Sequence, residues 1–160
     1  MNHIADFIFI FGAKYLYLFV AIVAFAWFLC QPRPKQKEFI IFICICLPLI
    51  FVLSEIAGRL YYSPRPFVLG QFEPLIYHKP DNGFPSHHTL LVSTISAVIF
   101  IFNKRIGLLL WGVSFFVGIS RVYTGVHHAV DIAAGVLIPV ISVASIFFLY
   151  TKVYLSKYKK

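Results

Sequence analysis

Long apolar runs separated by short polar stretches dominate this 160-residue chain. Five of the runs approach the length that a helix needs to cross a bilayer, because about 30 Å of hydrocarbon requires roughly 20 residues at about 1.5 Å each. The runs are continuous rather than alternating, and they are too long for tilted barrel strands. The pattern therefore predicts an all-α, polytopic transmembrane bundle of about five spanning helices, near residues 12–30, 38–57, 87–103, 106–123 and 129–151.

The composition agrees with this class of protein, since 60% of the residues are hydrophobic, 18% are aromatic and only 12% are charged. The length fits one domain, so we expect residues 1–160 to form a single integral membrane domain. No Lys or Arg precedes the first apolar run, and no small-residue cleavage site follows it, so we expect this run to remain in the mature protein. The linker Gln31-Pro32-Arg33-Pro34 is expected to end the first helix, because proline cannot continue it.

The formal net charge is +8, but the basic residues form short clusters between apolar runs rather than a stripe. This distribution argues against a nucleic-acid partner and instead predicts membrane topology. The clusters within 33–37, 104–105 and 152–160 all fall on one side of a five-helix bundle, and the positive-inside rule assigns that side to the cytoplasm. The loop around 60–86 and the turn around 124–128 then face the periplasm or the cell exterior.

The three cysteines, Cys30, Cys44 and Cys46, all lie inside apolar stretches. Cys44 and Cys46 are two residues apart, so on a helix they do not face each other. The sequence therefore predicts neither a disulfide nor a metal site.

A polar cluster near the fourth and fifth predicted helices is the strongest candidate for chemistry. His127 and Asp131 are four residues apart, so the carboxylate can reach the imidazole. A carboxylate on one ring nitrogen fixes the tautomer and leaves the other nitrogen free to attack. Arg121, next to Ser120, offers a planar fork suited to phosphate oxygens. An ion-paired cluster that merely ties helix ends together is the alternative, and the full spacing favours catalysis.

Two further clusters lie upstream, in Pro85-Ser86-His87-His88 and in Arg65-Pro66. Ser86 is a natural N-cap, and the free amides around Ser86 and His87 can hold an anion at the start of the third predicted helix. His88 is a candidate general acid. A capped helix with two interfacial histidines is the alternative, and it is favoured for His87 alone. Arg65, held between prolines, is a candidate phosphate-binding residue.

The three clusters, in this order and at this separation, resemble the signature of the type-2 phosphatidic acid phosphatase superfamily: Lys-x6-Arg-Pro, Pro-Ser-Gly-His and Ser-Arg-x5-His-x3-Asp. The third motif matches at every defined position, and the resemblance spans about 58–131. The stretches 58–68, 81–86 and 120–127 are similar to those of the bacitracin-resistance type of undecaprenyl-diphosphate phosphatase. That subgroup recycles the lipid carrier of the bacterial cell wall.

The resemblance implies an integral membrane lipid phosphatase that hydrolyses undecaprenyl diphosphate to undecaprenyl phosphate plus phosphate. His127 would attack the terminal phosphorus and form a phosphohistidine, and Asp131 would orient His127. His88 would protonate the leaving lipid phosphate and later activate water. The implied location is the bacterial cytoplasmic membrane, with the active site at its extracytoplasmic face; the oligomeric state is left open.

The resemblance also assigns Arg121, Arg65 and the amides around Ser86 and His87 to the binding of phosphoryl oxygens. Arginines and helix-start amides can supply the stabilisation that a magnesium ion gives elsewhere, so neither a metal nor another cofactor is expected. The expected partners are the lipid phosphate substrate and the bilayer itself.

The chain departs from the superfamily pattern at two positions. The motif lysine would fall on Gly58, and Arg59 follows one residue later, about 100° further around a helix. Arg59 therefore either binds phosphate or pairs with Glu55, four residues before it. His87 stands where superfamily members more often have Gly and the diphosphatase subgroup has Asp. It either tunes His88 or only fits the loop.

Four other polar residues are expected to lie at the surface, outside the site. Lys14, near the outer end of the first run, is expected to extend along the helix toward the membrane surface rather than to reach toward the substrate diphosphate. His78 and Lys79 are expected to be solvated in the outer loop, where their charge could still assist a diphosphate substrate. His128 is expected to be interfacial.

Other functions remain as alternatives. The same chemistry could act on phosphatidylglycerol phosphate, phosphatidic acid or a lipid A phosphate, because head-group choice depends on the outer loop. Vanadate-dependent haloperoxidases share the superfamily's site but are soluble, unlike this chain. A small membrane transporter or scaffold would need polar residues at mid-membrane depth, and the sequence offers few apart from Glu55.

Overall fold

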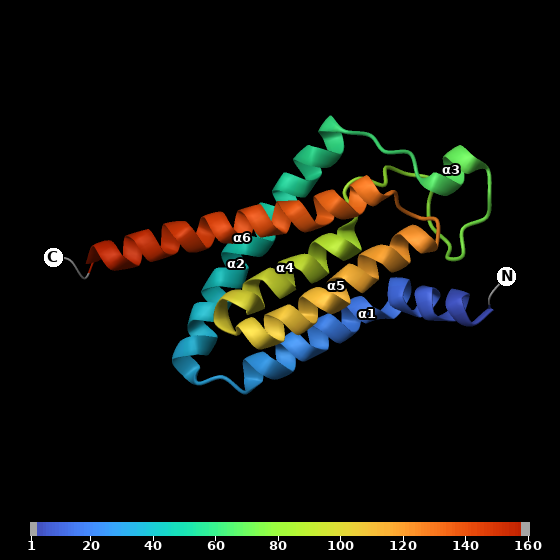
Figure 1. Cartoon of the computed structure of the whole chain (residues 1–160). Helices are drawn as coiled ribbons and strands as arrows, with labels where there is room; N and C mark the ends of the chain where they lie inside the picture. The colour runs from blue at the N-terminus through green and yellow to red at the C-terminus, as the bar shows by residue number, and fades with distance from the viewer. Residues whose placement is uncertain (1–2, 158–160) are drawn as a thin grey trace.

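The computed structural model describes residues 3–157, with side chains as far as Lys152, and its long helices run side by side (Figure 1). Apart from one isolated bridge between Pro64 and Asn82, this part of the chain contains only helices and loops. The expected helical membrane bundle is therefore confirmed. The helices are α1 (His3–Leu29), α2 (Arg33–Leu60), α3 (Pro66–Gly70), α4 (His87–Phe102), α5 (Lys104–Tyr123) and α6 (Ala129–Lys157).

The predicted helices differ from the observed ones mainly at their ends. α1 begins at His3 rather than near residue 12, and α2 extends at both ends beyond the expected 38–57. α3 was not expected; Pro66 at its first turn suits a helix start. The proline linker does separate α1 from α2, since α1 ends at Leu29 and Pro34 lies in the first turn of α2.

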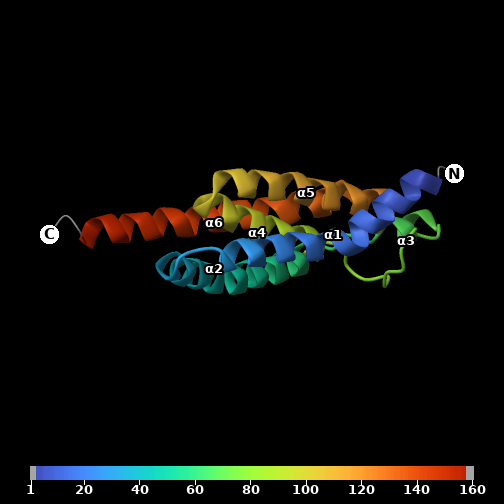
Figure 2. The same cartoon turned by 90° about the horizontal axis from the view of Figure 1, so that it is seen from below.

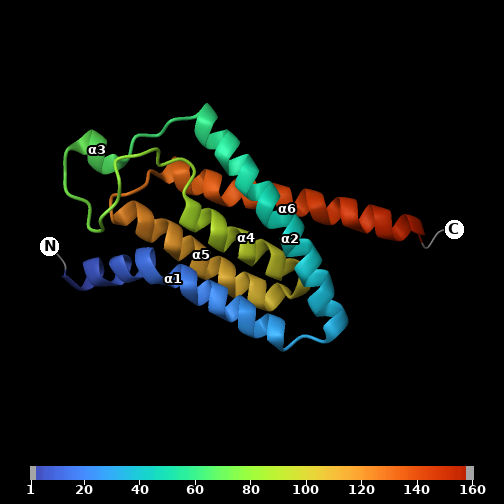
Figure 3. The ribbon, with the colours of Figure 1, turned by 180° about the vertical axis from the view of Figure 1, so that it is seen from behind.

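α4 is the short helix at the centre of the bundle. α1, α2, α5 and α6 are long and apolar enough to cross a membrane, whereas the 16 residues of α4 span about 24 Å. α4 packs against all four of these helices. Its start is therefore set back from the end of α5, and the loop after α3 passes over this end of the bundle (Figure 3).

Two apolar clusters hold α4 in place. Val92 and Ile99 pack with residues of α1 and α5, whereas Leu90 and Val98 pack with residues of α2 and α6. The outer faces of the long helices instead expose large apolar side chains such as Phe7, as expected for contact with lipid.

Small residues allow α4 to lie close to its neighbours, as is common between membrane helices. A Cβ at Gly135 of α6 would lie 3.0 Å from the Ser86 carbonyl oxygen at the start of α4. A Cβ at Gly107 of α5 would collide with the backbone of Phe100. The first contact matters for function, because it sets the start of α6 against the start of α4.

The loops divide between the two ends of the bundle (Figures 1 and 2). The N-terminal end of α1, α3, the start of α4 and the α5–α6 turn lie at one end. The α1–α2 and α4–α5 connections lie at the other, next to the basic clusters with which α2 and α5 begin. The polar motifs therefore gather at the end opposite those basic clusters.

Candidate active site

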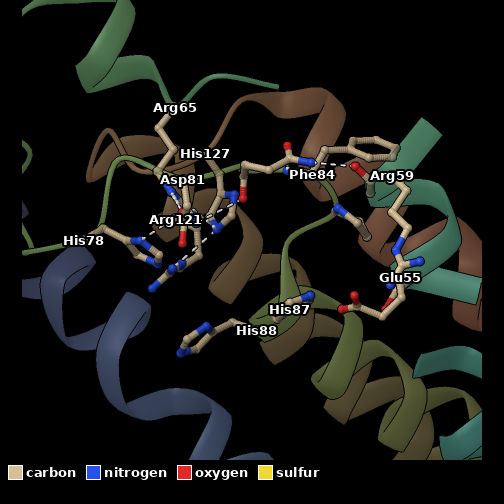
Figure 4. A pocket seen from close by; sticks show the side chains of 14 residues that line it. Glu55, Arg59, Arg65, His78, Asp81, Phe84, His87, His88, Arg121 and His127 are labelled. Atoms are coloured by element: carbon tan, nitrogen blue, oxygen red, sulfur yellow. Dashed lines mark hydrogen bonds and ion pairs between the residues drawn. The ribbon is translucent and has the colours of Figure 1, made fainter. Parts of the chain in front are cut away.

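The three polar clusters converge on one cavity of about 330 Å³. Arg65 comes from the start of α3, His88 from the start of α4, Arg121 from the end of α5 and His127 from the α5–α6 turn. Figure 4 shows these side chains around a shared space. Segments that are far apart in sequence therefore form one polar site. The cavity is lined by Ser54, Glu55, Gly58, Arg59, Arg65, His78, Asp81, Asn82, Phe84, Pro85, His87, His88, Arg121 and His127.

His127 has a different environment at each ring nitrogen. Its Nδ1 lies 3.4 Å from Oδ2 of Asp131, and the same oxygen accepts a 2.8 Å hydrogen bond from the backbone N–H of His128. Its Nε2 lies 3.3 Å from Nη2 of Arg121 and 3.4 Å from Nη1 of Arg65. Guanidinium groups only donate, so Nε2 carries the lone pair and Nδ1 carries the proton. This tautomer leaves the cavity-facing nitrogen nucleophilic.

Burial and charge keep His127 neutral. Desolvation, together with the positive charges of Arg121 and Arg65, lowers the pKa of His127 to about 4, although its bond with Asp131 acts in the opposite direction. The imidazole is consequently neutral at neutral pH, with its single proton on Nδ1. A neutral imidazole is the form that can attack phosphorus.

Arg65 and Arg121 are both buried, at 4% and 3% exposure. Nη1 of Arg65 donates to the Val126 carbonyl oxygen at 2.8 Å, and its Nε donates to Asp81 at 2.7 Å. Nη1 of Arg121 donates to the Ala13 carbonyl oxygen at 3.5 Å. Two buried guanidinium groups beside one neutral imidazole form a strongly positive site, which favours an anion such as phosphate.

The start of α4 differs from the expected phosphate cradle. The Ser86 N–H donates to the Asp131 carbonyl oxygen at 3.1 Å, and the Ser86 hydroxyl accepts from Thr89 at 3.2 Å. Ser86 is fully buried and does not line the cavity. It joins α4 to α6, and the first-turn amides that remain for an anion begin at His87. His87 is exposed, His88 is half-buried, and both line the cavity.

Glu55 and Arg59 line the opposite side of the cavity, on the last turns of α2 (Figure 4). Both side chains are exposed, and no ion pair joins them within 4 Å among the described residues. The alternative in which Glu55 occupies Arg59 is thus not seen. Arg59 faces the same cavity as Arg65 and Arg121, from the other side.

The loop before α4 contributes residues whose place the sequence did not reveal. His78 was expected to be solvated, but it lines the cavity, and its ring centroid lies 6.1 Å from that of His127. Asn82 shapes the loop: its Oδ1 accepts from the backbone N–H of Ser63 and Phe84, and its Nδ2 donates to the Gly58 carbonyl oxygen at 2.7 Å. The Asp81-to-Ser86 stretch that carried the subgroup resemblance was the only signal for this loop.

The remaining polar residues lie around the site. Lys14 is exposed and does not line the cavity. His128 is half-buried, and its Nε2 lies 3.0 Å from the Pro64 carbonyl oxygen, so it donates there and helps to hold the α3 segment. The ring of Tyr17 on α1 packs edge-on against His88, with centroids 5.0 Å apart.

Residues 37–156 match the PAP2 superfamily. This match covers most of the chain, so the protein belongs to the PAP2 superfamily, and the resemblance carried by the three motifs is confirmed.

Two named bacterial proteins are similar to this chain over part of their length. The chain is 43% identical over 98 residues to the bacitracin transport permease protein BcrC of Bacillus licheniformis, a match that covers 61% of this chain and 48% of that protein. It is 32% identical over 100 residues to the undecaprenyl-diphosphatase BcrC of Bacillus subtilis strain 168, covering 62% and 51%. The chain thus spans about half the length of the curated relatives it matches.

Solved structures share the fold over almost the whole chain. The crystal structure of Aquifex aeolicus LpxE is similar with a TM-score of 0.70 and 27% identity, covering 90% of this chain and 86% of LpxE. A transmembrane PAP2 type phosphatidylglycerolphosphate phosphatase from Bacillus subtilis is similar with a TM-score of 0.61 and 21% identity, covering 94% and 77%. The second likeness supports the fold alone.

Proposed function

We propose that this protein is a metal-independent membrane phosphatase that hydrolyses a lipid diphosphate, with undecaprenyl diphosphate as the expected substrate. The observation that carries the proposal is the environment of His127. Asp131 lies at its Nδ1, and two buried arginines lie at its Nε2. The printed name of the Bacillus subtilis relative, undecaprenyl-diphosphatase, supports the choice of lipid.

In the first step Nε2 of His127 attacks the terminal phosphorus, and the bond between this phosphorus and the bridging oxygen breaks. The Nδ1 proton stays with His127, and Asp131 stabilises the positive charge that develops on the ring. His88 donates a proton to the leaving lipid monophosphate. Arg121 and Arg65 turn from Nε2 to the phosphoryl oxygens, where they stabilise the charge of the transition state.

In the second step water attacks the phosphohistidine. His88, now unprotonated, accepts a proton from this water, the P–N bond breaks, and inorganic phosphate leaves. His127 regains its neutral form and His88 regains its proton. No step requires a redox partner or a metal ion, because arginines supply the positive charge.

The side of the cavity formed by α2 suits the second phosphate of a diphosphate. Arg59 supplies positive charge there, in place of the superfamily lysine, and His87, in the first turn of α4, lines the same cavity. A lipid monophosphate would leave this side empty. The amphiphilic substrate also fits the topology that the basic clusters indicate, with the site at the extracytoplasmic face of the bacterial cytoplasmic membrane.

A transport role is the second candidate, because the Bacillus licheniformis relative is named a transport permease protein. Transport of a polar molecule needs polar groups along the bundle. The buried polar residues there are small hydroxyls such as Ser93, Ser96 and Ser114, and Ser96 bonds to Ser114 at 2.9 Å. The charged residues that line the cavity lie together at one end of the bundle instead, as a single reaction site requires.

Phosphate release from purified protein in detergent tests the proposal. Undecaprenyl diphosphate, undecaprenyl phosphate and phosphatidylglycerol phosphate are supplied separately, with a chelator present. We expect release from the diphosphate without added metal and none from the His127→Ala variant. His3→Ala, an exposed position outside the cavity, is the control. Chelator-sensitive release, or release that survives His127→Ala, would overturn the mechanism. Release from the monophosphates alone would show that the substrate is a lipid monophosphate and not a diphosphate.

A further inference from the structure

The loop between α3 and α4 places a further histidine, His78, near the ring of His127. The side chain of His78 is only 26% exposed, and it lines the cavity with Arg65 and Arg121. Its ring stands nearly edge-on to that of His127, at an interplanar angle of 73°. Figure 4 shows it beside Arg121, on the same side as His127.

The loop is anchored well enough to hold this histidine in place. Ile76, two residues earlier, is 4% exposed and packs with Ala13 of α1 and Val126 of the α5–α6 turn. The Leu75 N–H donates to the Thr124 carbonyl oxygen at 3.1 Å. On the other side of His78, Asp81 accepts from Arg65 at 2.7 Å. His78 is therefore fixed by contacts before and after it.

One ring nitrogen of His78 remains for a ligand. Its Nδ1 lies 3.4 Å from the Lys79 carbonyl oxygen, which only accepts, so Nδ1 carries a proton. The carboxylate of Asp81 lies 3.9 Å from the same nitrogen. The other nitrogen, Nε2, is left to interact with whatever occupies the cavity.

The separation of the two rings indicates which atoms His78 could reach. A reacting phosphorus lies about 3–3.5 Å from the attacking nitrogen. A proton donor to the leaving oxygen lies about 3 Å further, on the far side of the phosphorus. The two distances together are about 6 Å, and the P–O bond and the two ring radii must still be added. The ring centroids of His78 and His127 are only 6.1 Å apart, so His78 lies too close to His127 to protonate the leaving oxygen. The spacing fits contact with a non-bridging oxygen of the transferred phosphoryl group.

The surrounding charges match this assignment. Burial, followed by the charges of Arg65 and Arg121, lowers the pKa of His78, so the ring is neutral in the empty site. Asp81 acts in the opposite direction, and His127 is itself neutral. A bound phosphate offsets the two arginines, which lets His78 take up a proton at Nε2 and donate it to a phosphoryl oxygen.

We propose that His78 binds a non-bridging oxygen of the phosphate transferred to His127, as a third ligand beside Arg65 and Arg121. This inference rests on the proposed function of the same site. It adds a binding residue that lies outside the three motifs and is delivered by a loop.

Inhibition by inorganic phosphate tests this role in the full chain. His78→Phe keeps the ring volume but removes the donor, and we expect it to weaken phosphate inhibition about tenfold or more, as for the loss of a hydrogen bond to a charged group. His78→Gln keeps an N–H near the Nε2 position and should restore part of the affinity. Tyr77→Ala, at an 89% exposed neighbour in the same loop, is the control and should behave as wild type.

Each outcome decides a separate claim. Equal phosphate inhibition in wild type and His78→Phe would overturn the inference, and so would accumulation of phosphoenzyme in His78→Phe, because His78 would then activate water. If the variants misfold, the nitrogen resonances of His78 in ¹⁵N-histidine-labelled wild type must still shift when phosphate is added. Wild-type protein that releases no phosphate from any lipid would instead refute the proposed function.

Discussion

The two sides of the cavity differ in how firmly their charged groups are held. Arg65 and Arg121 are buried and bonded to backbone oxygens, with His127 between them. Arg59 and Glu55, across the cavity, are exposed and not paired with each other. The first side has the preorganisation that transition-state stabilisation requires. On the second side, the exposed side chains can adjust their positions to the head group that binds.

The largest effect is expected from the firmly held side, at Asp131. Asp131→Asn places an amide where the His127 Nδ1–H and the His128 N–H both need an acceptor, so His127 is driven toward the wrong tautomer. We expect kcat to fall by about 10³- to 10⁴-fold, as for the comparable change in a serine protease triad. Phosphate release and thermal unfolding are measured together. A loss of less than tenfold in folded protein contradicts the assigned role of Asp131.

Arginine-to-lysine changes compare the two sides directly. Arg121→Lys keeps the charge but removes the fork that reaches both Ala13 and His127, and we expect kcat/KM to fall by about 10²-fold. Arg59→Lys restores the superfamily's residue type one position away and should change kcat/KM by less than about threefold. Arg105→Lys, exposed at the start of α5, is the control for α5. Equal losses at Arg121 and Arg59 would remove the distinction between the two sides.

The pKa of His127 tests whether the side of the cavity with Arg65 and Arg121 is as buried as the structure indicates. In the folded protein the pKa of His127 is about 4, so the ring stays neutral down to about that pH. In the unfolded chain the ring has an ordinary histidine pKa of about 6.5 and binds a proton below that pH. The free energy of unfolding should therefore fall as the pH drops from about 6.5 to about 4.

Nitrogen NMR of the ring measures this titration, with His127→Gln identifying the resonance. Arg65→Gln removes one of the charges that lower the pKa, so in that variant the His127 pKa should rise. A wild-type His127 that titrates near 6.5 would show that the site is more hydrated than its burial indicates.

Arg59→Gln should have a smaller and more selective effect. We expect kcat/KM for the diphosphate to fall about tenfold, because one contact to a charged phosphate is lost, whereas a lipid monophosphate should be nearly unaffected. Arg33→Gln, exposed at the opposite end of α2, is the matched control. An equal loss on both kinds of substrate would assign Arg59 to the reacting phosphate instead.

The smallest change is expected at Glu55. Its exposed carboxylate lines the same side of the cavity as Arg59 and repels a polyanion weakly. Glu55→Gln should lower KM for the diphosphate by about two- to threefold, in line with the small energies of solvated charge pairs. A large loss of kcat would indicate that this carboxylate takes part in the reaction, which the proposed mechanism does not include.

The sequence predicted the helices, and it pointed to the motif residues that the fold brings to the cavity, because both show as local patterns. Apolar runs define spanning helices, and the His127–Asp131 spacing brings imidazole and carboxylate together through one turn. The inward position of His78 could not be predicted, because it depends on distant contacts of Ile76 with Ala13 and Val126. The amides around Ser86 and His87 were expected to be free to hold an anion, but the Ser86 N–H bonds to the Asp131 carbonyl oxygen, a pairing set by helix packing.

α1 has a role that family membership does not reveal. It lies outside residues 37–156, yet its Ala13 carbonyl oxygen receives Arg121 and its Tyr17 supports His88. The family match alone would therefore draw the boundary of a minimal domain too narrowly. A protein trimmed to residues 37–156 would keep every motif. It would still lose the Ala13 carbonyl oxygen and the Tyr17 ring, which hold Arg121 and His88 in position.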